Sequence, residues 1–311
     1  MKKVFLDTDI GTDPDDSLCL TYLLCQPRCN LLGITTVGRE SGTRARLAGI
    51  FTRHFGAPAI PIAAGADQPF FSTPYWRGHE LGQAGVLEKW PVETSFAPSM
   101  AVPLMREAIR AHPGEVSLVA VGPLTNVALL AVSDPETALM VKELVIMGGK
   151  YDQDPDSPQT ECNTMLDPVS AGAVFQHRWP EVRVISLDTT GGKSITMAQM
   201  EENLDREKFA PLYAFAEARH GRGNAKGIGG HDPLTAATLF APDLLTFKRG
   251  RTRIRLSDHD PARGTPLEGD SITGWTTFEP AEDGPHSVAA HEDADAARRA
   301  FHKHLFEVLC G

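Results

Sequence analysis

The sequence predicts an α/β protein with an open, mostly parallel Rossmann-like sheet, flanked by helices and followed by a small C-terminal hairpin. Two observations predict this fold class. Short β-rich runs alternate with helical patterns as far as residue 240, and the pattern then changes to two strand-like runs around a loop rich in Gly and Pro. In such a sheet, ligands bind at the C-terminal ends of the strands.

Each β-rich run in the first 240 residues is followed by one or more helical patterns. In chain order the pairs are VFLDTD (4–9) with 15–25, LLGITTVG (31–38) with 43–55, IPIAAG (60–65) with 100–111, EVSLVAVG (115–122) with 126–132, KELVIMGG (142–149) with a helix after 167, and VRVISLD (182–188) with helices between 197 and 220. The hairpin strands are expected at 251–258 and 270–278, and a last amphipathic helix at 293–309.

Composition and charge narrow the class of partner. The net charge of -10 disfavours a nucleic acid or an anionic membrane, and no apolar run approaches membrane-spanning length. The N-terminus enters an apolar strand directly, without the features of a secretory signal, so we expect cytoplasmic residence. We expect one domain over residues 1–311 that binds a small neutral or cation-assisted ligand.

Five aspartates fall within ten positions of VFLDTDIGTDPDDSLCL (4–20). Three of them fit the start of a helix, with Asp13 as the N-cap and with Asp15 and Asp16 in the first turn, where the helix dipole favours acids. Asp7 and Asp9 need another explanation, because they lie two residues apart on a strand and project to the same face at its C-terminal end.

Carboxylates that converge at one strand end repel one another unless a cation offsets their charge. Oxygen ligands alone indicate Ca²⁺ or Mg²⁺ rather than zinc. An EF-hand is excluded, because the glycine is misplaced and the twelfth position from Asp7 is Leu18. A phosphotransfer site of the haloacid-dehalogenase type, with Asp7 as nucleophile and Asp9 as acid/base, stays open on this motif alone.

Three further motifs place polar residues at helix starts. They are VAVGPLTNVALL (119–130), with Thr125 or Asn126 near the cap; TECNTMLDP (160–168), with Glu161 and Asn163 before a helix capped by Asp167; and GIGGHDPLTAATLF (227–240), with His231 and Asp232 after a Gly-rich loop. Each motif alone is also explained by turn or capping chemistry.

In this order, DTDIGTDPDD, GITTVGRE, IPIAAGADQP, VAVGPLTN, VIMGGK, ECN and GGHDPLTA together resemble the inosine-uridine-preferring nucleoside hydrolase family. The resemblance is strong over residues 4–246 and looser beyond. It disfavours the dehalogenase alternative, which gives no reason for GPLTN and GGHDP. It implies the family's open α/β fold, a tightly held Ca²⁺, and hydrolysis of the N-glycosidic bond of ribonucleosides.

The resemblance also implies roles for single residues. Asp9 resembles the base that takes a proton from a calcium-bound water, and it also touches the ion. Asp16, Asp232 and the backbone carbonyl of Thr125 match the other calcium ligands. His231 resembles a histidine that helps to protonate the departing base. The residues matched to substrate binding are Asp15, Glu40, Glu161, Asn163 and His79.

This sequence departs from the family pattern at several positions. Ile10 replaces a proline, and two extra residues follow Asp9, which leaves Asp13 as either a helix cap or a second functional carboxylate. Glu40 stands where asparagine is commoner, and Pro155 stands where an asparagine would contact the 5′-hydroxyl. An atypical N-riboside substrate, or a non-catalytic nucleoside-binding relative, is therefore the alternative.

Some properties stay open from sequence. The preferred nucleobase is one of them, because loops without a readable pattern would contact the base. His79 is either a base-contacting or an exposed loop residue, and Trp275 either stacks on a base or packs within the hairpin. The resemblance further implies a homodimer or homotetramer.

Overall fold

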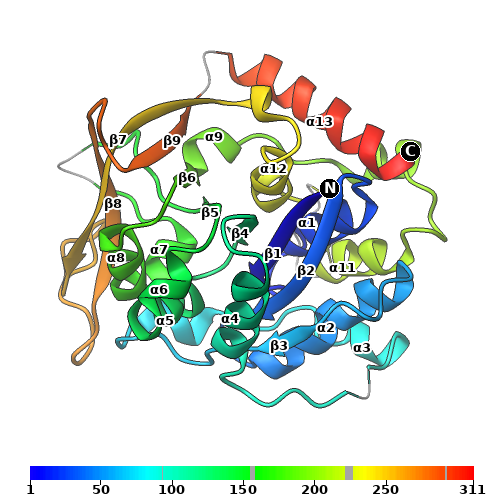
Figure 1. Ribbon diagram of the computed structural model, residues 1–311, viewed down its shortest axis with the longest axis horizontal. Coiled ribbons are helices and arrows are strands. Elements are labelled where there is room, and N and C mark those ends of the chain that lie inside the picture. The colour runs from blue at the N-terminus through cyan, green and yellow to red at the C-terminus, as the bar shows by residue number, and fades with distance from the viewer. Residues whose placement is uncertain (93, 155–157, 221–226, 291–292) are drawn as a thin grey trace.

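The computed structural model describes residues 1–92, 94–154, 158–220, 227–290 and 293–311. In these residues nine strands form one sheet with the order β3-β2-β1-β4-β5-β6-β9-β7-β8 (Figure 1). The strands are β1 Lys2–Thr8, β2 Cys29–Thr36, β3 Ile62–Ala64, β4 Val116–Ala120, β5 Glu143–Met147, β6 Val182–Ile185, β7 Thr246–Ser257, β8 Thr273–Pro280 and β9 His286–Ala290.

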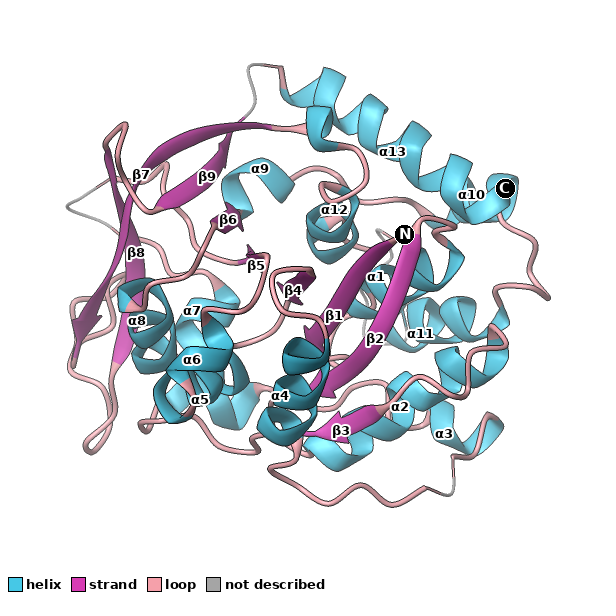
Figure 2. Ribbon diagram, viewed as in Figure 1, coloured by secondary structure: helices cyan, strands magenta, loops and turns pink. Residues whose placement is uncertain are grey.

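Helices connect and flank these strands (Figure 2). The α-helices are α1 Asp15–Cys25, α2 Ser41–His54, α3 Val86–Lys89, α4 Ala101–Ala111, α5 Thr125–Ser133, α6 Pro135–Ala138, α7 Cys162–Leu166, α8 Pro168–Gln176, α9 Leu187–Thr190, α10 Met197–Asn203, α11 Ala210–His220, α12 His231–Ala237 and α13 Ala294–Cys310. Two 3₁₀ turns are η1 Pro74–Gly78 and η2 Pro242–Leu244. None of the helices in the described residues has the length and apolarity needed to cross a membrane.

The predicted parallel sheet is confirmed. Along the sheet, the neighbouring strands β3, β2, β1, β4, β5, β6 and β9 all pair in parallel. The last two strands differ, because β7 runs antiparallel to both β9 and β8. The predicted hairpin is therefore β7 and β8, and it joins the main sheet through β9. Because the chain moves from β1 to β2 and β3 on one side and then to β4, β5 and β6 on the other, the strand order reverses between β1 and β4. A ligand crevice is expected outside that point.

Two apolar cores lie on the two faces of the sheet. Along β1, Val4 and Leu6 belong to one core and Phe5 to the other, as the alternation of side chains in a strand requires. Helices α1, α11, α12 and α13 pack together on the first face, and α4, α5 and α8 pack together on the second (Figure 1). The helices thus cover both faces and leave the strand ends for the site.

The start of α1 differs from its prediction. The helix begins at Asp15, and its N-cap position is Pro14, with no side-chain cap. Asp13 therefore does not occupy the N-cap position of α1. Asp15 and Asp16 do lie in the first turn, where the partial positive charge of the helix N-terminus favours carboxylates.

A buried histidine makes the stability of this fold depend on pH. His286, in β9, accepts a hydrogen bond at Nδ1 from the backbone N–H of Thr252 at 2.9 Å. Burial, assisted by the charge of Arg251, lowers the pKa of His286 to about 4. An unfolded histidine titrates near pH 6.5. The unfolded chain therefore binds more protons between about pH 6.5 and 4, and stability falls as the pH drops through that window.

We expect wild type to lose about 2 kcal/mol more stability than His286→Asn between pH 7 and pH 4.5. Asparagine retains an acceptor near the position of Nδ1 but does not titrate. Urea unfolding of both proteins at both pH values measures the difference, in which acid effects common to both proteins cancel. An equal loss in both would contradict this account of His286.

Candidate active site

A cavity of about 190 Å³ opens where the strand order reverses. The loop after β1, the residue after β4, the end of β5 and the starts of α7 and α12 contribute to its wall. Eight of the residues predicted from sequence to form a site line this cavity, namely Asp9, Asp15, Asp16, His79, Glu161, Asn163, His231 and Asp232. The fold thus brings together segments from seven regions of the chain, which also include the segment of His79 and the start of α9 at Leu187.

Three of these carboxylates form a compact buried cluster. One oxygen each from Asp15, Asp16 and Asp232 lies within 4.8 Å of the other two. Burial, together with repulsion among the carboxylates, raises the pKa of all three groups. Ionised carboxylates this close together need a cation to offset their charge. Asp16 also accepts a hydrogen bond from the Thr8 hydroxyl, which fixes its orientation.

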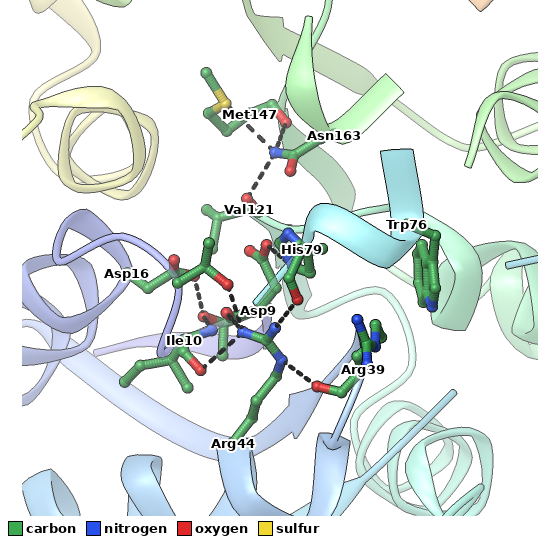
Figure 3. A network of polar contacts seen from close by, with 12 residues as sticks. Asp9, Ile10, Asp16, Arg39, Arg44, Trp76, His79, Val121, Met147 and Asn163 are labelled. Carbon is green, nitrogen blue, oxygen red and sulfur yellow. Dashed lines mark hydrogen bonds and ion pairs between the residues drawn. The ribbon is translucent and has the colours of Figure 1, made fainter. Parts of the chain in front are cut away.

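Asp9 lies at the same cavity but has a different environment (Figure 3). Its Oδ2 lies 2.9 Å from Nε2 of His79, and both side chains are buried. Burial alone would raise the pKa of Asp9, but the contact and charge of His79 and the charge of Arg44 outweigh it and lower the pKa. Asp9 is therefore a carboxylate at neutral pH. His79 is buried rather than the exposed loop residue that was the alternative from sequence.

A glycine permits the close approach of β4 to Asp9. A Cβ atom built at Gly122 would lie 2.9 Å from Oδ1 of Asp9. The GP turn after β4 thus leaves room for this carboxylate, which a larger residue would displace.

Asp7 stands behind the cavity, not in its wall. It is fully buried and accepts hydrogen bonds at Oδ1 from the Thr35 hydroxyl at 2.6 Å and from the Asn126 amide at 2.8 Å. Burial raises its pKa to about 7. Asp7 therefore ties β1 to β2 and α5, and this position does not suit the nucleophile that a dehalogenase-type site would require.

Glu161 and Asn163 present two polar groups from α7, a helix that the sequence did not predict. Glu161 is the N-cap of α7, and its carboxylate accepts backbone N–H groups of Asn163 (2.7 Å), Thr164 (3.0 Å) and Gly149 (2.9 Å). The amide of Asn163 donates to the carbonyl of Val121 at 2.8 Å (Figure 3). Both side chains are therefore held rigidly at the cavity.

His231 begins α12 beside Asp232. Its Nδ1 lies 2.7 Å from the hydroxyl of Thr190, which fixes the ring. Burial lowers the pKa of His231, while the charge of Asp13, which also lines the cavity, acts in the opposite direction. Asp13 thus faces the same cavity as His231.

Two predicted site residues are not brought to the cavity. Glu40 is exposed at the N-cap of α2, with φ of 62°, and does not line it. Thr125 begins α5, and its hydroxyl donates to Asp167 at 2.7 Å. Trp275 lies opposite Arg255 in the β7–β8 hairpin and does not line the cavity either. Pro155 lies outside the described residues.

Other residues of the wall were not indicated by the sequence motifs. Val121 and Met147 line the cavity directly after β4 and at the end of β5. Val121 lines the cavity and its carbonyl accepts a hydrogen bond from the amide of Asn163, whereas Thr125 does not line the cavity. The rule that sites form at strand C-termini could have indicated both residues.

A larger hollow of about 900 Å³ lies between α8 and β7. Its wall includes three arginines that alternate along β7, Arg251, Arg253 and Arg255. This hollow lacks the carboxylate cluster, so its size does not make it the candidate active site.

The fold and the cavity together define an α/β enzyme with a buried acidic site at the strand ends. The chain belongs to the inosine-uridine preferring nucleoside hydrolase family, whose family model matches residues 4–301. It is therefore an enzyme that hydrolyses N-glycosidic bonds, as the sequence predicted.

Individual relatives agree with this assignment. The chain is 33% identical over 252 residues to the non-specific ribonucleoside hydrolase RihC of Shigella flexneri serotype 5b (strain 8401), covering 79% of this chain and 81% of that protein. Its fold is similar to a plant nucleoside hydrolase, PpNRh1 (TM-score 0.75, 23% identity, 100% and 99% of the chains covered). It is also similar to a purine-preferring ribonucleoside hydrolase from Gardnerella vaginalis (TM-score 0.74, 23% identity, 99% of each chain covered).

Proposed function

We propose that this protein is a Ca²⁺-dependent ribonucleoside hydrolase, which converts a nucleoside and water into ribose and a free nucleobase. The observation that carries the proposal is the division of the cavity into two kinds of carboxylate. Asp15, Asp16 and Asp232 form a cluster that needs a cation, and Asp9 is held ionised beside it.

The donors at the cavity fit a hard divalent ion. The cluster supplies carboxylate oxygens, and the Val121 carbonyl is a neutral oxygen at the same wall. Oxygen-only donors of this kind suit Ca²⁺. When bound, the ion polarises the oxygens of water and of ribose hydroxyls. Direct contact of Asp9 with the ion stays a prediction.

Asp9 acts as the general base in this proposal. A base must be ionised before it can accept a proton, and the lowered pKa of Asp9 ensures this at neutral pH. Its neighbours in the cluster have raised pKa values, so the two kinds of carboxylate are suited to different tasks. Asp9 would take the proton of the water that attacks C1′.

The remaining polar groups hold the sugar and assist the leaving base. As the N-glycosidic bond stretches, positive charge develops on C1′ and the ring oxygen, and the acidic wall stabilises it. Glu161, Asn163 and Asp15 are the proposed ribose-binding groups. His231, fixed through Nδ1 by Thr190, keeps Nε2 for the departing base.

We expect the purified protein with Ca²⁺ to release ribose from at least one member of a panel of purine and pyrimidine ribonucleosides. A reducing-sugar assay and chromatography of the free base measure the products. Absence of ribose release from the entire panel, with calcium shown to be bound, would overturn the proposed activity. Residence in the cytoplasm, a single domain over residues 1–311 and a homodimeric or homotetrameric state stay predictions.

A further inference from the structure

Arg44 is a fully buried cation next to the cavity, and none of the sequence motifs includes it. It lies on α2 and donates hydrogen bonds to the loop that follows β1 (Figure 3). Its Nη1 contacts the carbonyl of Asp9, the carbonyl of Ile10 at 3.2 Å and the hydroxyl of Thr12 at 2.9 Å. One side chain thus contacts three residues of the acidic loop, Asp9, Ile10 and Thr12.

The same guanidinium reaches two other segments. Nε donates to the carbonyl of Arg39 at 2.8 Å, after β2, and Nη2 donates to the carbonyl of His79 at 3.4 Å, after η1. The ring of His79 in turn lies 2.9 Å from the carboxylate of Asp9. Arg44 therefore holds the backbone of both residues of this side-chain contact.

The chemistry of this position favours arginine. A buried cation is costly unless its donors are satisfied, and a planar guanidinium carries five N–H donors that point to different sides. An ammonium group presents three donors from one atom and cannot reach three separate segments. Space is also restricted, since a Cβ at Gly38 would lie 3.3 Å from Nε of Arg44 and 3.1 Å from Cδ2 of His79.

We infer that Arg44 is a positioning residue for the reaction: it sets the place of Asp9 in the cavity and joins the acidic loop to the His79 segment. The inference rests on the proposed function, in which Asp9 is the base. A purely structural role would be confined to stability, whereas a positioning role also changes the order of the loop and the rate of the chemical step.

Arg44→Lys tests this inference, because lysine keeps the positive charge but lacks the separate N–H donors of the guanidinium group. We expect kcat/KM for the best nucleoside of the panel to fall about 10- to 100-fold, mainly through kcat, as is typical when supporting hydrogen bonds of a catalytic group are lost. The matched control is Arg183→Lys. Arg183 pairs with Glu143 at 2.6 Å at the start of β6, away from the cavity, and its variant should keep kcat/KM within about twofold.

A second measurement does not depend on activity. Hydrogen–deuterium exchange of Arg44→Lys should be faster than wild type in residues 9–12 and 79–82, and Arg183→Lys should leave these segments unchanged. Added guanidinium should restore part of the turnover of Arg44→Ala. If wild type hydrolyses no nucleoside but the exchange pattern appears, the proposed function fails and the positioning of the loop by Arg44 stands.

The inference is overturned if Arg44→Lys loses stability alone, with exchange in residues 9–12 and kcat both as in wild type. If Arg44→Lys does not fold, Thr12→Val replaces it, since this variant removes one acceptor and keeps the cation. Thr12→Ser is then the conservative control. Faster exchange of residues 9–12 in Thr12→Val but not in Thr12→Ser supports the inference, and equal exchange in both contradicts it.

Discussion

Asp9→Asn is expected to lower kcat by about 10²- to 10⁴-fold while the protein stays folded and binds Ca²⁺. The amide has nearly the shape of the carboxylate but cannot accept a proton at neutral pH. A loss of 10³ corresponds to about 4 kcal/mol of transition-state stabilisation. Steady-state kinetics of ribose release, with calcium content measured on the same sample, test this expectation.

A matched control separates catalysis from stability. Asp134→Asn changes another aspartate with charged partners. Asp134 is the N-cap of α6, forms ion pairs with Arg106 and Arg110, and does not line the cavity. It should lower stability without a change in kcat. If Asp9→Asn retained wild-type turnover, Asp9 could not be the base, and the role assigned to it from the sequence would be wrong.

Asp232→Asn is expected to have opposite effects on stability in the absence and in the presence of Ca²⁺. Asp232 is buried with Asp15 and Asp16, and the repulsion among the three carboxylates lowers the stability of the metal-free protein. Removing one charge should therefore leave the metal-free protein as stable as wild type or more stable. Calcium affinity should fall at least about 10- to 100-fold, and the stabilisation that calcium gives should shrink with it.

Calorimetric titration with Ca²⁺ and thermal unfolding with and without the ion measure these two effects. Asp167→Asn is the matched control, because Asp167 is also fully buried but caps α8 outside the cavity. It should reduce stability equally in both conditions and leave calcium affinity unchanged. Unchanged calcium affinity in Asp232→Asn would remove this residue from the proposed metal site.

Patterns of side-chain type predicted much of the fold and part of the site. The alternation of β-rich and helical runs predicted the parallel sheet, because strand and helix periodicities are local properties of the chain. The aspartates after β1, and His231 and Asp232 at the start of α12, could be identified from sequence because their side chains are the reactive groups. Their common position at strand ends followed from the topology.

What the sequence did not predict depends on backbone atoms or on three-dimensional packing. Val121 lines the cavity and its carbonyl accepts from Asn163, but every residue has a carbonyl, so no residue type indicates this position from sequence. Arg44 acts from a helix on three separate segments and has no characteristic spacing. Glu40 was assigned to the site by its position in a motif, although the αL turn at the start of α2 leaves it exposed.

The most direct test of the central claim is a calcium titration of the metal-stripped enzyme, followed by ribose release from its best nucleoside. Stripped protein is expected to be inactive, and turnover is expected to return in proportion to bound Ca²⁺ and to reach its maximum at one ion per chain. Full activity in the stripped protein, or bound calcium that restores none, would contradict the claim that the buried carboxylates serve hydrolysis through a cation.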